Sequence, residues 1–323
     1  MAQPSNLFDS YDAKGIRESL SDVISRISPE ETPFISNVGK SNVKNTYFEW
    51  QTDALDSVDS ANKHVEGDDA AAGAQTPTKR LANYVQISRK VVATSGTVEA
   101  TDRAGRKGEL AYLMAKASAS LKRDMEAIAT QNQAGLAGNN STARQTAGVE
   151  SFLSSNVSRG ATGANPTLSG TTEGYPNAAP TDGTQRAFTE TLLKGVIQSM
   201  WSNGGTPKML MLGPKNTQAF SAFAGIASNR FNISGAKKAA IIGSASIYVS
   251  DFGNLEVVSN RFSRDRSALL LDPEYAEIAY LRPFQTVELA KTGDSDKKMI
   301  VVEWGVKVVN EAAHGIVADL TTP

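Results

Sequence analysis

The run from Glu109 to Gln133 holds neither glycine nor proline, and this feature constrains the fold more than any other. Apolar residues recur in it at steps of three and four, which predicts one long helix with an apolar stripe. About 25 residues at ~1.5 Å of rise each give a rod of roughly 38 Å, longer than a small compact domain needs. Gly105 and Gly108 mark its start, and Gly135 and Gly138 mark its end. The stripe consists of Leu110, Met114, Ala117, Leu121, Met125 and Ile128, with Leu113 beside it and Lys116, Lys122, Arg123 and Glu126 on the other faces.

Composition narrows the class of protein. With 323 residues the chain exceeds what one core usually fills, so we expect two compact lobes and additional extended pieces. Lys and Arg (33) nearly balance Asp and Glu (34), which argues against a dedicated nucleic-acid binder but is compatible with packing beside DNA. The lack of cysteine excludes disulfides, thiolate metal sites and thiol nucleophiles. No apolar run is long enough to span a membrane and no secretory signal is evident, so we expect cytoplasmic synthesis and no membrane partner.

The first part of the chain reads as an arm followed by a long hairpin. Residues 10–27 fit a short amphipathic helix within an arm over residues 1–43, and Pro33 predicts an extended backbone at Phe34 and Ile35. Alternating residues in 44–51 predict a strand whose partner lies within 81–93, which makes 44–93 an extended hairpin.

The loop of this hairpin is long and acidic. Such loops are uncommon inside compact domains, so we expect it to contact another copy of the chain, although a merely solvated loop is an open alternative. Its acidic residues are Asp53, Asp56, Asp59, Glu66, Asp68 and Asp69, and the basic residues at its base are Lys79, Arg80, Arg89 and Lys90.

The rest of the chain divides into segments of different amino-acid composition and apolar pattern. Residues 136–188 are rich in Gly, Ser and Thr and read as a second projection or connector. A compact α/β unit follows over 189–281, with helices at 189–203 and from Pro214 through Phe223 and strands near 208–212, 246–251, 255–259, 268–271 and 277–281. The tail, 282–323, predicts a closing sheet with a hairpin of 285–290 and 298–309 and a last strand at 314–320. The sheet and the rod helix of 94–135 then share one lobe, and the predicted fold class is α+β.

A search for catalytic chemistry finds little. The two histidines, His64 and His314, lie in no recognisable metal motif, and the Gly-x-Ser-x-Gly nucleophile pattern is absent. Gly39-Lys40-Ser41 resembles the end of a phosphate-binding loop, but the glycine that should precede it is replaced by Phe34, so we interpret it as a loop with Lys40 solvated. We expect no cofactor, no metal and no enzymatic activity.

Two further groups of residues can be interpreted either as structural or as functional. Arg261, Arg264 and Arg266 cluster around Asp265, and an exposed loop with local ion pairs is favoured over a contact with another subunit or a polyanion. The three tryptophans Trp50, Trp201 and Trp304 stand at strand or helix spacing, which favours core packing over base stacking.

Four sequence motifs occur in this order along most of the chain: Glu31-Thr-Pro-Phe-Ile-Ser, Tyr47-Phe-Glu-Trp-Gln-Thr-Asp, Gly148-Val-Glu-Ser-Phe-Leu, and Trp201-Ser-Asn-Gly-Gly-x-Pro followed by Met209-Leu-Met-Leu-Gly-Pro. Together with the order arm, hairpin, rod helix, α/β unit and closing sheet, they resemble the major capsid proteins of tailed bacteriophages. None of the four is a mechanistic signature by itself.

The resemblance implies a subunit of an icosahedral head. It implies a peripheral domain formed by the spine helix and the closing sheet, an axial domain over 189–281, and a hairpin that reaches over a neighbouring subunit. The implied partners are copies of the chain in hexamers and pentamers, packaged double-stranded DNA bound non-specifically, and separate scaffolding, portal or decoration proteins. The implied location is the virion. The residues expected at contacts between subunits are Phe34, Asp53, Asp56, Asp59, Lys63, Glu66, Asp68, Asp69, Lys79, Arg80, Arg264 and Arg266.

Two alternatives stay open from the sequence. The same fold can form a cellular nanocompartment that encloses protein cargo, and nucleic acid in purified particles would discriminate the two. A cofactor-independent enzyme with its site in the α/β unit would instead be a stable monomer with a deep polar cleft.

Overall fold

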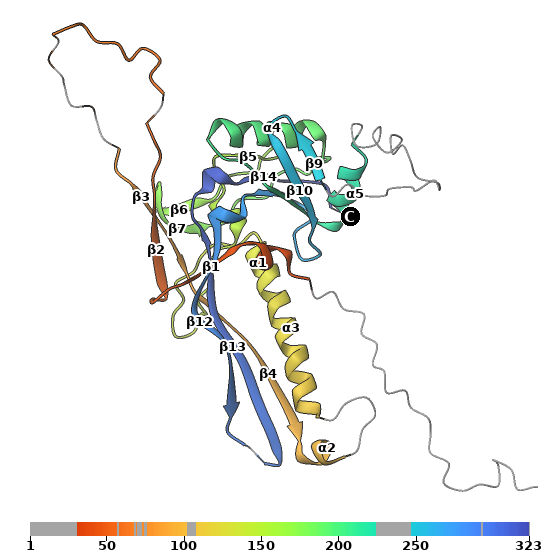
Figure 1. Ribbon diagram of the computed structural model, residues 1–323. Coiled ribbons are helices and arrows are strands. Elements are labelled where there is room, and N and C mark those ends of the chain that lie inside the picture. Colours follow the sequence, from red (N-terminus) through yellow and green to blue (C-terminus); the bar gives the residue numbers. More distant parts are fainter. Residues whose placement is uncertain are drawn as a thin grey trace, which may run out of the picture.

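The computed structural model describes residues 31–56, 58–67, 69, 73, 76–101, 108–223, 247–291 and 293–322. The amphipathic helix predicted for residues 10–27 and the glycine at 105 lie outside these ranges. Figure 1 shows an elongated molecule: a helix and a narrow sheet form a long leg, an α/β body sits at one end of it, and a loop projects from the side of the body.

The predicted rod is α3, Glu109–Ala129, which ends before the predicted end at Gln133. The residues that follow Ala129 leave the helix because their polar groups bind elsewhere. The Asn132 amide donates to the Pro180 carbonyl oxygen at 2.8 Å, and the Gln133 amide donates to the Thr146 carbonyl oxygen at 2.7 Å. The stripe is confirmed at Leu121 and Met125, which are buried, whereas its members in the first half of the helix are only half-buried.

A four-stranded sheet with the order β1-β12-β13-β4 packs against α3. Strand β1 (Gly39–Asn42) runs parallel to β12 (Ala276–Leu289), and β13 (Ser295–Val308) pairs antiparallel with β12 and β4 (Gln86–Ser95). The short α2 (Gly96–Ala100) follows β4. The sheet faces α3 with Val302 and Trp304, both fully buried, which confirms the core placement predicted for Trp304. The alternation predicted for β13 is wrong in terms of burial, because residues 301–306 are buried on both faces of the sheet.

This sheet corrects three sequence predictions. Residues 39–41, expected in a loop, form β1, although Lys40 is exposed as expected. The strands expected at 277–281 and 285–290 are one strand, β12, whose pairing with β13 is irregular around Arg282. Most of the segment 81–93, expected to pair in the hairpin, belongs to β4 in this sheet, because residue 85 separates it from the hairpin strand.

A six-stranded sheet with the order β5-β14-β11-β8-β10-β9 forms the α/β body. Helices α4 (Glu190–Ser202) and α5 (Pro214–Ser221) cover one face, where Leu193 and Ile197 pack on Leu210 and Leu212. Met209, Met211 and Leu269 lie in the same cluster as the core of the leg. The two cores therefore share this sheet. Its strands are β5 (Val157–Ser158), β8 (Met209–Leu212), β9 (Ile247–Ser250), β10 (Gly253–Ser259), β11 (Ala268–Leu271) and β14 (Gly315–Val317).

Two predictions about this body are wrong. The last strand, expected within 314–320 in the closing sheet, is β14 and pairs with β11 and β5 instead, because Ile316 and Val317 fill the core of the body. Trp201, expected on the buried side of α4, is 51% exposed and packs only against Phe252, with ring centroids 5.4 Å apart. It stands near the end of the helix, beyond the last buried turn.

The third sheet, β2-β3-β7-β6, supports the projecting loop. The predicted hairpin strand is β2 (Tyr47–Thr52), which pairs antiparallel with β3 (Lys79–Tyr84). The segment expected as a connector contributes β6 (Thr167–Gly170), β7 (Glu173–Ala178) and the 3₁₀ turn Val149–Phe152, which is buried. Two further 3₁₀ turns, Pro273–Tyr275 and Glu311–Ala313, flank the entries to β12 and β14.

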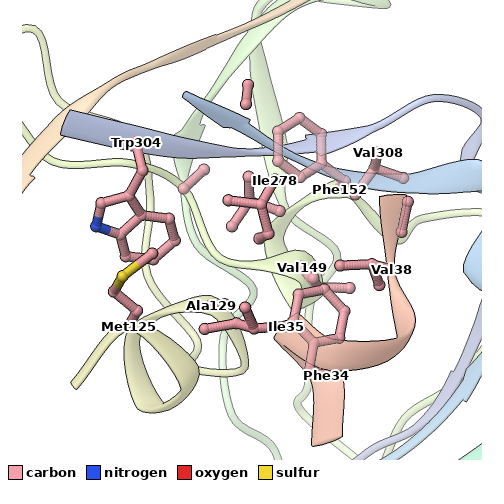
Figure 2. Close-up of a cluster of buried hydrophobic side chains, with 14 of the residues drawn as sticks. Phe34, Ile35, Val38, Met125, Ala129, Val149, Phe152, Ile278, Trp304 and Val308 are labelled. Atoms are coloured by element: carbon pink, nitrogen blue, oxygen red, sulfur yellow. The ribbon is translucent and has the colours of Figure 1, made fainter. Parts of the chain in front are cut away.

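The arm enters the core through α1, Pro33–Asn37. Phe34 and Ile35 are therefore helical, not extended as predicted, because proline at the first position of a helix loses no hydrogen bond. Figure 2 shows Phe34, Ile35 and Val38 packed beside Ala129 and Val149. The base of the arm is thus part of the subunit core.

Candidate intersubunit surfaces

The loop between β2 and β3 projects away from the body (Figure 1), and those of its residues that the structure describes form no helix or strand. Leu55 is 99% exposed and Val58 is 97% exposed, and Val65 is also largely exposed. Large apolar side chains gain about 1.5–3 kcal/mol each on burial, so this segment has a strong tendency to bind another surface. The expected contact residues Asp53, Asp56, Asp59, Lys63, Glu66 and Asp69 are exposed in this loop, and Asp68 lies outside the described residues.

The base of the loop is fixed by Asn83, a fully buried residue of β3. Its Nδ2 donates to the Val306 carbonyl oxygen at 2.7 Å and to Thr146 Oγ1 at 3.0 Å. Its Oδ1 accepts from the backbone N–H groups of Tyr84 and Ala147 at 2.8 and 2.9 Å. Asn83 thus ties the hairpin to β13 and to the connector, so that the loop projects from a rigid base.

The two basic residues at this base, Lys79 and Arg80, are exposed at the start of β3. Arg80 lies 3.7 Å from the Glu49 carboxylate across the strand pair. Surface pairs of this kind contribute little to stability, so both cations stay accessible to another chain.

The face of the sheet opposite α3 carries an apolar row. Val91, Met299 and Val287 are cross-strand neighbours in β4, β13 and β12, and Val91 is 52% exposed. The adjacent row includes Arg89, which is exposed, so the apolar row has a basic flank. We call Ile87, Arg89, Val91, Val287 and Met299 the outer sheet face.

Arg264 and Arg266 bind carboxylates of their own chain. Arg264 Nη1 lies 2.9 Å from Glu150 Oε2, and its Nη2 lies 2.6 Å from Asp182 Oδ2. Arg266 Nη2 lies 3.4 Å from Asp319 Oδ1. These pairs join the connector, the turn after β10 and the end of the chain. The exposed loop with local ion pairs expected from the sequence is wrong for Arg264 and Arg266, because both are partly buried and their partners lie 53 to 114 positions away. These donors are already occupied within the chain.

Glu150 is the buried centre of this network, with 2% of its surface exposed. Burial raises the pKa of its carboxyl group, while Arg264 and a hydrogen bond from Ser267 act in the opposite direction. Partial burial would also raise the pKa of Asp182, but Arg264 and Arg266 lower it on balance. This network could not be predicted from the sequence, because its members are far apart in the chain.

Phe34 and Glu126 meet in the core. The Phe34 side chain, expected at a subunit contact, is fully buried within its own subunit because α1 inserts it beside α3. Glu126, expected on a polar face, is also fully buried and accepts hydrogen bonds from the backbone N–H groups of Phe34 and Ile35. Glu126 directly follows Met125 of the stripe, which was the one signal that could have placed it near the core.

Both ring nitrogens of the buried His314 form hydrogen bonds with backbone groups. The Asp272 N–H donates to Nδ1 at 3.3 Å, so Nε2 carries the proton and donates to the Tyr275 carbonyl oxygen at 3.2 Å. Burial lowers the pKa of this imidazole, which favours the neutral form. Within the described ranges, no three metal-ligating side chains gather at one place, and no helix there is long and apolar enough to cross a membrane.

Comparisons with known proteins agree with this architecture. The sequence matches the family described as SU10 major capsid protein over residues 3–321. It is 32% identical to the major capsid protein of Escherichia phage Phieco32, in an alignment covering 98% of this chain and 97% of that protein. Among solved structures, the capsid asymmetric unit of cyanophage A-1(L) superimposes with a TM-score of 0.70 at 13% identity, covering 95% of this chain and 98% of that one.

An encapsulin from Synechococcus elongatus has a related fold. Its TM-score is 0.51 at 9% identity, and the match covers 92% of each chain. A likeness at this identity concerns the fold alone.

Proposed function

This chain belongs to the SU10 major capsid protein family, and on that basis we propose that its copies form hexamers and pentamers of an icosahedral shell around double-stranded DNA. Membership of the family makes the protein the structural subunit of a phage capsid and places it in the virion. The assembly into capsomers and the enclosed DNA are our proposal. The observation that carries it is the nearly complete exposure of Leu55 and Val58 on a loop with a rigid base.

The loop and the outer sheet face are complementary in chemistry. The loop combines Leu55 and Val58 with the acidic Asp53, Asp56 and Asp59, and the outer sheet face combines apolar Val91 with basic Arg89. We infer that the loop of one subunit covers the outer sheet face of a neighbour. Each contact can be weak, because a subunit in a lattice makes several contacts whose free energies reinforce one another.

The charge of the chain supports weak and non-specific contact with DNA. A net charge of −1 provides no excess of cations for tight phosphate binding, so DNA would be held without sequence preference. We infer that the protein is not an enzyme, since a shell subunit acts through assembly. Separate scaffolding, portal and decoration proteins are the further partners that we propose.

Removal of the loop tests the proposal. Thr52 and Lys79 are paired in register, so residues 53–78 can be replaced by an Asn-Gly turn without disturbing β2 and β3. We expect a folded subunit that no longer forms closed particles under the electron microscope. Closed particles of normal size from this variant would refute the role of the loop. Nuclease-protected DNA in wild-type particles is expected for a head, and protein cargo without DNA would favour a nanocompartment.

A further inference from the structure

One carboxylate joins three parts of the subunit that are distant in sequence. Glu126 Oε1 accepts from the Phe34 N–H at 2.7 Å and from Asn260 Nδ2 at 2.7 Å, and Oε2 accepts from the Ile35 N–H at 2.9 Å. Phe34 and Ile35 belong to α1, Glu126 to α3, and Asn260 directly follows β10. We call this group of four residues the arm junction; the close-up of Figure 2 shows Phe34 and Ile35 beside the turn of α3 that bears Met125 and Ala129.

The charge of Glu126 is balanced by hydrogen-bond donors and by no cation. No ion pair in the described part of the chain includes it, and α1 carries no charged side chain. Charged residues close to Glu126 or Asn260 in the sequence are directed elsewhere: Arg123 lies over the Phe262 ring at 5.3 Å, Asp124 pairs with Lys90, and Arg261 is exposed. A buried charge that loses one of its donors is strongly destabilised, so the three hydrogen bonds depend on one another.

Each end of the junction is anchored to a larger unit. The Asn260 N–H donates to the Leu212 carbonyl oxygen at 2.8 Å, which fixes Asn260 to the end of β8 in the six-stranded sheet. At the other end, α1 is followed directly by β1, and residues 1–30 precede it. A displacement of the six-stranded sheet therefore reaches α1 through Asn260 and Glu126.

We propose that Glu126 is a positioning residue that couples the placement of α1, at the base of the N-terminal arm, to the position of the six-stranded sheet. The inference rests on the proposed function, since it assigns Glu126 a part in shell assembly. Because coupling is reciprocal, a contact that a neighbour makes with the arm changes the free energy of placing the sheet, and a contact with the sheet changes that of placing the arm.

The junction also has a defined pH dependence. Burial raises the pKa of Glu126 above its ordinary value of 4.5, and the hydrogen bonds from Ile35, Phe34 and Asn260 offset only part of that rise. When α1 detaches, the carboxyl group is hydrated and its pKa returns towards the ordinary value. The closed junction therefore has its full stability below the ordinary pKa, and loses stability as the pH rises through the raised pKa.

Hydrogen exchange of the full-length protein in assembled particles tests the inference. The measured quantity is the protection of the Phe34 and Ile35 amides, corrected for the intrinsic exchange rate at each pH. The measurements cover a range of about 3.5 pH units, from about 4.5 to about 8. The variants are Glu126→Gln and Asn260→Ala. Glu49→Gln, an exposed carboxylate on β2, is the matched control, and the amides of β8 report whether the whole subunit opens.

In the wild type we expect protection of the two amides to rise as the pH falls, while β8 is unchanged. Glu126→Gln is expected to lower the protection about tenfold and to abolish its pH dependence, because its amide presents donors to the backbone N–H groups. Asn260→Ala is expected to lower the same protection about threefold although Asn260 touches neither amide. Unchanged protection in either variant, or a wild type without pH dependence, overturns the inference even if the particles are normal. Failure of wild-type subunits to form particles would instead count against the proposed function.

Discussion

Asn83 and Val306 stand 223 residues apart in the chain and are joined by a 2.7 Å hydrogen bond from the Asn83 side chain to the Val306 carbonyl oxygen. The bond connects β3, at the base of the projecting loop, to β13, one of the two central strands of the leg. Next to it, the ring of Phe48 packs on Gly305, where an added Cβ would lie 2.8 Å from the ring. The loop is therefore held by a closely packed base in which small changes are costly.

Replacement of Asn83 should destabilise the subunit. Asn83→Ala leaves the buried Tyr84 and Ala147 N–H groups and the Val306 carbonyl oxygen without this partner, so we expect a loss of about 3 kcal/mol in the free energy of unfolding. Asn83→Asp should be at least as harmful, because its carboxylate faces the Val306 carbonyl oxygen. Urea unfolding measures both, and a wild-type midpoint for either variant would contradict the role of Asn83.

Arg264 should be essential for stability through Glu150. Arg264→Met leaves the buried Glu150 carboxylate without its cation, and we expect a loss of about 3–5 kcal/mol. The double variant Arg264→Met with Glu150→Gln should recover part of this loss, because no buried charge remains. A double variant that is less stable than Arg264→Met alone would show that the pair is not coupled in this way.

His314 should make the subunit sensitive to mild acid. Its folded-state pKa is lowered from 6.5 by burial, so its contribution to stability is complete above pH 6.5 and is lost as the pH falls towards the lowered pKa. The slope from this one group is at most about 1.4 kcal/mol per pH unit. The difference in unfolding free energy between the wild type and His314→Gln isolates it from Glu126 and Glu150, whose raised pKa values act in the opposite sense. If this difference in unfolding free energy stays constant over about 2.5 pH units, from about 7.5 to about 5, the buried imidazole is not neutral as proposed.

The exposed apolar residues of the loop should matter for assembly but not for folding. Leu55→Ser with Val58→Ser removes side chains that have almost no contact within the subunit, so the melting temperature should stay the same. If a neighbour buries them, the subunit concentration needed for particle formation should rise about tenfold or more, at ~1.5–3 kcal/mol per side chain. Light scattering measures this threshold, and Ala61→Ser is the control. An unchanged threshold would show that the loop tip does not contact a neighbour.

The elements with strong local periodicity were predictable from sequence. Helix α3 and the apolar strand β8 follow from side-chain spacing, and both lie close to their predicted positions. Short elements set by tertiary contacts were not predictable. α1 forms where an extended backbone was expected because Glu126 satisfies two of its N–H groups, and β1 forms because β12 offers a free edge.

The polar residues of the candidate surfaces also differ in how far they could be predicted. The acidic residues of the loop were recognisable from a long segment poor in large apolar residues, and those in the described ranges are exposed. The roles of the polar groups that hold the loop base and the arm, Asn83, Glu126 and Glu150, could not be predicted, since each acts through partners many positions away. A buried polar residue is recognised by the groups that satisfy it, and those groups are known only once the chain is folded.

The six-stranded sheet has a consequence for attempts to dissect the subunit. Met209, Met211 and Leu269 on one of its faces are covered by residues from outside the span 189–281, and β14 completes it from near the end of the chain. A fragment limited to that span would lack the two strands β5 and β14 and would leave a bare apolar surface in water, so it would aggregate when expressed alone. The leg and the α/β body share the core on this sheet, so we expect them to fold as one unit.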